Sequence, residues 1–174
     1  MGKFFVYILF IVASLVFTSC RHYKQSSSSI KKVSPSTQKL HKKHRAILVD
    51  VACKQLKTPY KWGGNSPKGF DCSGFTSYCY SQLGVQIPRT AIEQSLVGKK
   101  VRAKRVKAGD LIFFKGSDKK QKKVAHVGIV VSGRKKNIKF VHAASKGVMM
   151  SQLSEEYFSK RFKTIRRISK GTGF

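Results

Sequence analysis

Hydrophobic residues recur at helical spacing in the first half of the chain. Over residues 41–57 they fall on one face with lysines opposite, and Pro59 then predicts the end of that helix. A second apolar stripe runs over residues 72–83, and Gly84 is a typical helix terminator. The apolar positions are Leu48, Val51, Ala52 and Leu56 in the first helix and Phe75, Tyr78, Cys79 and Leu83 in the second.

Beyond Gly98 the pattern changes to short apolar runs of the length of β-strands. Before that change, Thr90 and Glu93 have the spacing of a capping box and predict a short third helix. Helices followed by strands indicate an α+β fold, in which N-terminal helices pack on a mostly antiparallel sheet of five to six strands. The expected strands are residues 110–115, 125–132, 138–144, 148–150 and 162–168.

The first 19 residues have the order of a secretory signal. Lys3 precedes an apolar run over residues 4–17, which is shorter than the roughly 20 residues that a transmembrane helix needs. Cys20 then resembles the diacylated cysteine of a bacterial lipobox, with Phe17 where leucine is usual. A plain signal peptide and an uncleaved anchor are the alternatives, and all three place the body of the protein outside the cytoplasm.

Residues 20–40 are rich in serine, lysine and glutamine and show no apolar period. We interpret them as a flexible tether between a lipid on Cys20 and one folded domain, residues 41–174. A chain of 174 residues suits a single core. The expected location is therefore the cell envelope, with the protein anchored to a membrane and facing the periplasm or the exterior.

The chain is strongly basic, with 36 lysines and arginines against 7 acidic residues and a formal net charge of +29. Nucleic acid is not an expected partner, because the chain carries an export signal and no alternation of arginine with aromatic residues. Anionic envelope polymers or lipid headgroups explain the charge in one interpretation. In the other, the lysines are simply a solvated surface.

Cys72 stands at the start of the second predicted helix, directly after Asp71. The partial positive charge of a helix start favours thiolate, and the N–H groups of Cys72 and Ser73 can bind an oxyanion. Asp71 works against a thiolate, so we assign it the capping of the helix.

Cys79 lies about 10 Å along the helix, too far for a disulfide with Cys72. Cys53 and Cys79 either pair or, as we favour, are buried small residues.

Two histidines are predicted to share one face of a hairpin. Residues 132–137 supply its turn, and a turn centred on Arg134 pairs His126 with His142. Directly opposed residues share a face, with Cβ atoms about 4.5–5.5 Å apart. A slip of two residues keeps that shared face. A thiol at a helix start, with two imidazoles arriving from strands, is the arrangement of a papain-like cysteine hydrolase.

Six short motifs resemble those of the NlpC-type, papain-like cell-wall endopeptidases, in the same order and spacing over residues 46–168. The one departure is Ala108, where the family usually has proline. The motifs are Tyr60-Lys61-Trp62-Gly63-Gly64, Asp71-Cys72-Ser73-Gly74-Phe75, Pro88-Arg89-Thr90, Gly109-Asp110-Leu111-Ile112-Phe113-Phe114, Ala125-His126-Val127-Gly128-Ile129 and Phe140-Val141-His142-Ala143.

The resemblance implies a role for each matching residue. Cys72 is expected to be the nucleophile, His126 the general base and then acid, and His142 the group that orients His126. The phenol of Tyr60 is expected near the oxyanion site, although a buried aromatic residue with a satisfied hydroxyl is the alternative. Arg89 either binds a substrate carboxylate or, as we favour, is a solvated loop cation.

These observations predict a lipid-anchored peptidoglycan endopeptidase that cuts peptide-stem or cross-link bonds by a Cys-His-His mechanism. The alternatives are an acyltransferase or amidase with the same apparatus, and an inactive envelope-binding lipoprotein. No cofactor is expected, and the spacings of cysteine and histidine predict no metal site. The expected partners are peptidoglycan peptides and, through the N-terminal lipid, a membrane, with the protein itself a monomer.

Overall fold

The structure is a computed structural model, which describes residues 35–116 and 122–168. The predicted signal peptide, the predicted lipidation at Cys20 and most of the predicted tether lie outside these residues, so those predictions stay predictions. Within the described ranges, no helix has both the length and the apolar character needed to cross a membrane.

The helices begin close to the predicted positions, with one exception. The first, α2 (Pro35–Lys54), starts six residues inside the segment predicted as a tether, so that prediction is wrong for residues 35–40. It ends at Lys54, because the chain turns at Lys57 (φ 72°) two residues before Pro59. The other helices are α3 (Cys72–Ser81), α4 (Ala91–Gln94), α5 (Glu156–Ser159) and the 3-10 turns η1 (Ala103–Arg105) and η2 (Lys135–Asn137).

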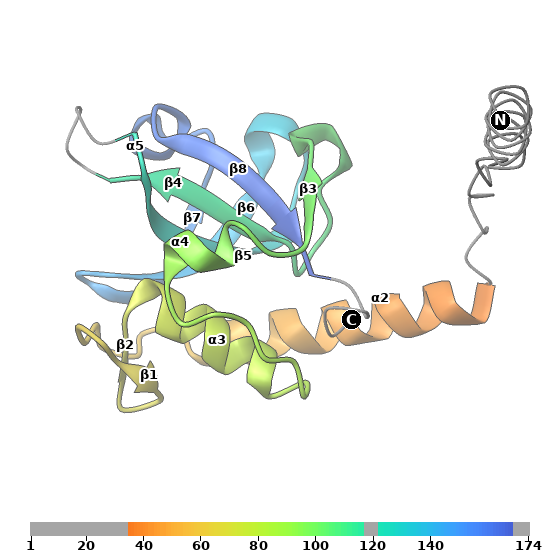
Figure 1. Cartoon of the computed structure of the whole chain (residues 1–174), viewed down its shortest axis with the longest axis horizontal. Coiled ribbons are helices and arrows are strands. Elements are labelled where there is room, and N and C mark those ends of the chain that lie inside the picture. The colour runs from red at the N-terminus through yellow and green to blue at the C-terminus, as the bar shows by residue number, and fades with distance from the viewer. Residues whose placement is uncertain (1–34, 117–121, 169–174) are drawn as a thin grey trace, which may run out of the picture. The chain divides into compact units, whose positions relative to one another are not determined.

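A six-stranded antiparallel sheet forms the second layer, in the order β3-β8-β4-β5-β6-β7 (Figure 1). All five predicted strands are present, which confirms the α+β fold class. The edge strand β3 was missed because it is three residues long and begins with two exposed lysines. The strands are β3 (Lys99–Val101), β4 (Leu111–Lys115), β5 (Val124–Ser132), β6 (Lys139–Ala144), β7 (Gly147–Gln152) and β8 (Phe162–Arg167), with a separate pair β1 (Asn65–Ser66) and β2 (Gly69–Phe70).

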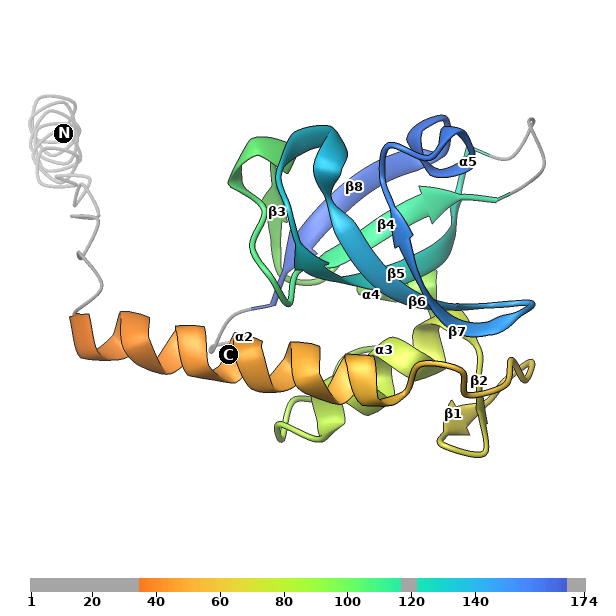
Figure 2. The same ribbon diagram turned by 180° about the vertical axis from the view of Figure 1, so that it is seen from behind.

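Both faces of the sheet are buried. One face packs against α2 and α3, which lie together on the same side of the sheet in Figures 1 and 2. The other face forms a second apolar cluster with Phe158 of α5. This double burial explains why Leu111 to Phe114 form an unbroken apolar run, which is typical of a strand covered on both sides.

The predicted register of the histidine hairpin is off by two residues. Ile129 pairs with Val141 and Val130 with Phe140, and this register continues to place His142 across from Gly128. The pairing of Ser132 with Lys139 centres the turn between Lys135 and Lys136 instead of on Arg134, and the irregularity between Val130 and Ser132 then changes the register by one residue. A slip of two residues preserves the shared face, so His126 and His142 still lie on the same side of the sheet, as diagonal neighbours.

Candidate active site

The start of α3 positions the thiol of Cys72. Asp71 is the N-cap residue, with extended backbone, and its Oδ1 accepts a hydrogen bond of 2.6 Å from the N–H of Gly74. The predicted capping role of Asp71 is therefore confirmed. Gly74 has no side chain because a Cβ there would collide with the carbonyl oxygen of Gly64. The helix start is thus packed directly against the segment that leads into β1.

Burial works against the predicted thiolate. The pKa of the Cys72 thiol is raised, first by burial and then by the charge of Asp71, despite backbone hydrogen bonds from Val127, Ser73 and Cys72 that lower it. The helix start alone therefore does not make the thiolate the favoured resting form. The hydrogen bond from Val127 also shows that the thiol lies beside the residue that follows His126.

The two histidines form a hydrogen-bonded chain that ends on a serine. His126 Nε2 lies 2.8 Å from His142 Nδ1, and His142 Nε2 lies 3.2 Å from Ser151 Oγ. The two imidazole rings meet edge to face, with centroids 4.9 Å apart. His142 is 2% exposed and Ser151 6% exposed, so neither has an alternative partner in bulk water.

This chain of contacts constrains the tautomers. If Ser151 Oγ accepts the N–H at His142 Nε2, then His142 Nδ1 is an acceptor and His126 must donate from Nε2. The lone pair of His126 then lies on Nδ1, the nitrogen that His142 does not occupy. A neutral imidazole with a free lone pair at that atom is what a general base needs. The geometry therefore supports the predicted orienting role of His142.

Burial keeps both imidazoles neutral. It lowers the pKa of His126 from 6.5 to about 4. Burial, with a smaller contribution from the charge of His126, lowers the pKa of His142 to about 3. At neutral pH the site therefore holds a thiol and an uncharged base, and proton transfer from sulfur to nitrogen has to accompany attack on the substrate.

A cleft of about 1190 Å³ brings together the predicted site residues. Cys72, His126, Tyr60, Ser73 and Arg89 all line it, whereas His142 stands behind His126. The pKa of the Tyr60 phenol is raised by burial, then by the nearby Cys72 and Asp71. A protonated phenol close to the thiol is consistent with the predicted place of Tyr60 beside the oxyanion.

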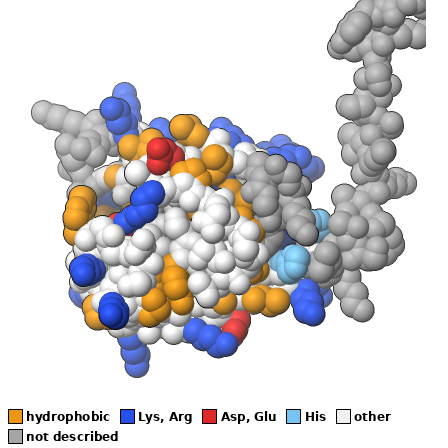
Figure 3. Space-filling view, turned by 60° about the horizontal axis from the view of Figure 1, so that its bottom comes forward, with side chains coloured by type: hydrophobic (Ala, Val, Ile, Leu, Met, Phe, Trp, Pro, Cys, Tyr) orange, Lys and Arg blue, Asp and Glu red, His pale blue; other side chains and the backbone are white. Residues whose placement is uncertain are grey.

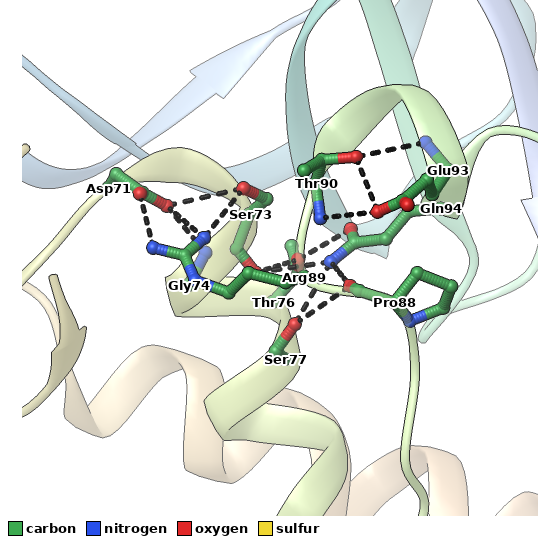
Figure 4. Close-up of polar contacts among 10 residues, drawn as sticks. All are labelled: Asp71, Ser73, Gly74, Thr76, Ser77, Pro88, Arg89, Thr90, Glu93 and Gln94. Carbon is green, nitrogen blue, oxygen red and sulfur yellow. Dashed lines mark hydrogen bonds and ion pairs between the residues drawn. The ribbon is translucent and has the colours of Figure 1, made fainter. Parts of the chain in front are cut away.

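Arg89 is an exposed loop cation, as the sequence favoured, but it also forms an ion pair at the start of α3. Its Nη2 lies 2.6 Å from Asp71 Oδ2, and its Nη1 lies 3.1 Å from both Asp71 Oδ1 and Ser73 Oγ (Figure 4). Burial raises the pKa of Asp71, but hydrogen bonds from Arg89 and Gly74 outweigh it, and the net pKa lies below its ordinary value. Arg89 therefore offsets part of the negative charge of Asp71, which raises the pKa of the Cys72 thiol.

The loop that carries Arg89 is held by Gln94, a residue that the sequence analysis did not single out. Gln94 is fully buried, and its Nε2 donates to the carbonyl oxygens of Pro88 (2.8 Å) and Ser73 (3.1 Å), while Oε1 accepts from Thr76 (2.8 Å) (Figure 4). The helix α4 that contains Gln94 starts with the predicted capping box of Thr90 and Glu93. These contacts fix the loop to the start of α3.

Among the described residues, Cys53 and Cys79 do not line the cleft. Cys53 and Cys79 are free thiols, and burial raises the pKa of each. Within residues 35–116 and 122–168, no cluster of three or more histidine, cysteine or acidic side chains could hold a metal ion.

Residues 57–167 match the model of the NlpC/P60 family. The chain belongs to the NlpC/P60 family. It is 34% identical over 149 residues to the bifunctional muramidase/DL-endopeptidase CwlT of Bacillus subtilis, covering 85% of this chain and 42% of that protein. It is 38% identical over 111 residues to the murein DD-endopeptidase MepS/murein LD-carboxypeptidase of Escherichia coli K12, covering 63% and 55%. The chain thus spans about half the length of these two relatives.

A solved structure supports the fold. The chain superimposes on an NlpC/P60 family protein from Bacillus cereus with a TM-score of 0.64 and 32% identity, covering 71% of this chain and 39% of that one. That agreement extends the family assignment to the arrangement of helices on the sheet.

Proposed function

We propose that this protein is a cysteine-type peptidoglycan endopeptidase, with Cys72 as nucleophile and His126 as general base. The observation that carries the proposal is the chain from His126 through His142 to Ser151, which leaves His126 Nδ1 free beside the cleft that holds Cys72. The two relatives are named for endopeptidase activity, one of them on murein, and this supports the substrate class.

The residues present account for each step of amide hydrolysis. His126 takes the thiol proton of Cys72 as sulfur attacks the scissile carbonyl carbon. The backbone N–H groups at the start of α3 and the phenol of Tyr60 stabilise the oxyanion. When the C–N bond breaks, the His126 imidazolium gives its proton to the leaving nitrogen. Water, deprotonated by His126, then hydrolyses the thioester and restores the thiol.

The location follows from the same proposal. A peptidoglycan enzyme acts in the cell envelope, and the predicted lipid on Cys20 would hold it there as a monomer on a short tether. The positive charge is also compatible with an anionic envelope. Figure 3 shows lysine and arginine side chains spread over the viewed face, separated by hydrophobic and uncharged groups.

Incubation with purified muropeptides, followed by mass spectrometry of the products, tests the proposal. Cleaved stems or cross-links indicate a hydrolase, new conjugates a transferase, and retention without products a binding protein. Cys72→Ala is expected to abolish turnover. Cys53→Ala and Cys79→Ala remove free thiols away from the cleft and serve as matched controls, because they are expected to retain turnover. Normal turnover by Cys72→Ala would contradict the proposal.

A further inference from the structure

A second cavity of about 740 Å³ adjoins the catalytic cleft on the far side of His126. Tyr60, Ala125 and His126 line both spaces, whereas Cys72 lines only the first. The second cavity lies where β4 ends, β5 begins and β6 ends, and Tyr157 of α5 forms another part of its wall. His126 therefore stands at a junction between two spaces.

The mechanism decides which part of the substrate each space receives. The acyl part stays bound to the sulfur of Cys72 after the C–N bond breaks. The leaving nitrogen must lie beside His126, because the imidazolium of His126 supplies its proton. A space that shares His126 but not Cys72 is therefore placed for the leaving part.

Lys115 gives this second cavity a positive charge. With both histidines neutral, its ammonium is the one charged group among the described residues that line the cavity. Lys115 is half-buried, and the ion pairs found within residues 35–116 and 122–168 do not include it. The acidic residues at α5 are engaged elsewhere: Glu155 accepts from the N–H of Gln152, and Glu156 pairs with Lys160.

The sheet is irregular around Lys115. Both pairings of β4 lose their regular register near its end, next to β5 between Phe114 and Lys115 and next to β8 between Phe113 and Phe114. In both places the extra residue lies on the partner strand, Ala125 in β5 and Lys163 in β8, and such irregularities are common beside active sites. The N–H of Lys115 also donates to the carbonyl oxygen of Arg161 (2.8 Å), which ties it to the segment that follows α5.

The part of the wall that Tyr157 forms is held in place by Arg161. The guanidinium of Arg161 lies 4.0 Å from the centre of the Tyr157 ring, and Arg161 Nη1 donates to the Tyr157 carbonyl oxygen. Tyr157 is 52% exposed, so one aromatic face is held in place while the phenol remains accessible. An ammonium and hydroxyl groups from Tyr157 and Ser145 together suit an acidic group on a compact residue.

We propose that the second cavity binds the leaving part of the substrate and that Lys115 binds a free carboxylate on the leaving residue. The proposal rests on the proposed function and narrows it. Bonds whose leaving residue keeps a free carboxylate are cleaved in preference to bonds whose leaving residue has that carboxyl in amide linkage. Lys115 is thus a specificity-determining residue, separate from the groups that move protons.

Matched synthetic muropeptides test this preference. For each of the two candidate bonds, in the stem and in the cross-link, one peptide carries a free carboxylate on the leaving residue and its twin a carboxamide. Wild-type protein is expected to favour the free acid in kcat/KM by about tenfold, as for one charge-assisted hydrogen bond. Lys115→Met is expected to lose that preference, because kcat/KM falls for the free acid and not for the carboxamide. Lys115→Arg is expected to keep the preference.

Lys99→Met, which removes the same charge at the distant edge strand β3, is the matched control and is expected to keep the wild-type preference. Equal cleavage of acid and amide by wild-type protein, or an equal loss on both with Lys115→Met, would overturn the proposal for Lys115 while leaving the proposed function intact. Absence of cleavage of all four peptides by wild-type protein would instead overturn the proposed function, and this inference with it.

Discussion

The two walls of the catalytic cleft are built in different ways. The α3 wall is largely local in sequence, since Asp71, Cys72 and Ser73 are consecutive and Arg89 joins them from the next loop. The wall formed by the sheet is assembled from three strands, which contribute His126, His142 and Ser151. One wall depends on the start of a helix and the other on strand pairing.

The two walls also differ in the charge states of their residues. The α3 wall keeps its carboxylate ionised and balances it with an ion pair to Arg89. The sheet wall avoids charge, because burial lowers the pKa of both histidines well below neutral pH. Burial is the first cause of the pKa shift on both sides, and at the nucleophile the charge of Asp71 adds to it. Substitutions in the sheet wall should therefore have effects that depend on how directly each residue touches the transferred proton.

The largest effect in the sheet wall is expected for His126→Ala. This residue moves the proton in every step, and general acid–base catalysis alone contributes typically 10²–10⁴-fold. Single-turnover rates per folded molecule measure the loss. Near-normal rates would mean that another group acts as the base.

His142 is expected to tolerate polar replacements. It orients His126 without touching substrate, so His142→Asn or His142→Asp should keep measurable turnover, because an amide or carboxylate oxygen can accept the N–H of His126. His142→Leu should lose most of it. Equal losses for Asn and Leu, after correction for folded protein, would show that His142 acts only as a packing residue.

Ser151→Ala is expected to lower kcat by about three- to tenfold, the range for one neutral hydrogen bond. The alanine leaves the Nε2 of His142 without its partner, so its tautomer is no longer fixed. Ser151→Thr keeps the hydroxyl and should recover most of the rate. A purely structural role predicts no such recovery, and KM is expected to change little in either variant.

The smallest effect concerns stability in acid. The folded pKa of His142 is about 3, below its ordinary 6.5, so the unfolded chain binds the proton first as the pH falls. The contribution of neutral His142 to the free energy of unfolding is therefore fully present at neutral pH. It is lost progressively as the pH falls below about 6.5. Denaturant unfolding of wild type and His142→Leu at pH 7 and pH 4 tests this. The leucine variant should lose less stability between the two pH values, and an equal loss would contradict the assignment.

The same contrast between walls explains what the sequence could predict. Asp71 and Cys72 are neighbours, so the helix start, the cap and the nucleophile follow from a short motif. The shared face of His126 and His142 follows from alternation along strands. Their register does not, because the polar turn does not show on which residue it is centred. Ser151 was missed because it lies one residue past the predicted end of its strand, residues 148–150.

Partners that meet only in the folded chain were beyond sequence reasoning. Arg89 and Asp71 are 18 residues apart, and no spacing rule joins a loop cation to a helix cap at that distance. Gln94 lies in a correctly predicted short helix, but its burial depends on how α4 packs on α3. Lys115 follows an apolar run like an ordinary end of a strand, and its place in the lining of the second cavity is visible in the structure alone.

The central claim is that His126, held by the sheet wall, activates the thiol of the α3 wall. The rate of alkylation by iodoacetamide, mapped cysteine by cysteine with peptide mass spectrometry, tests it most directly. Cys53 and Cys79 serve as internal controls in the same molecule. Cys72 is expected to react faster than both in the wild type and to slow markedly in His126→Ala, with the other two unchanged. Faster labelling at Cys79, or a Cys72 rate that does not depend on His126, would contradict the claim.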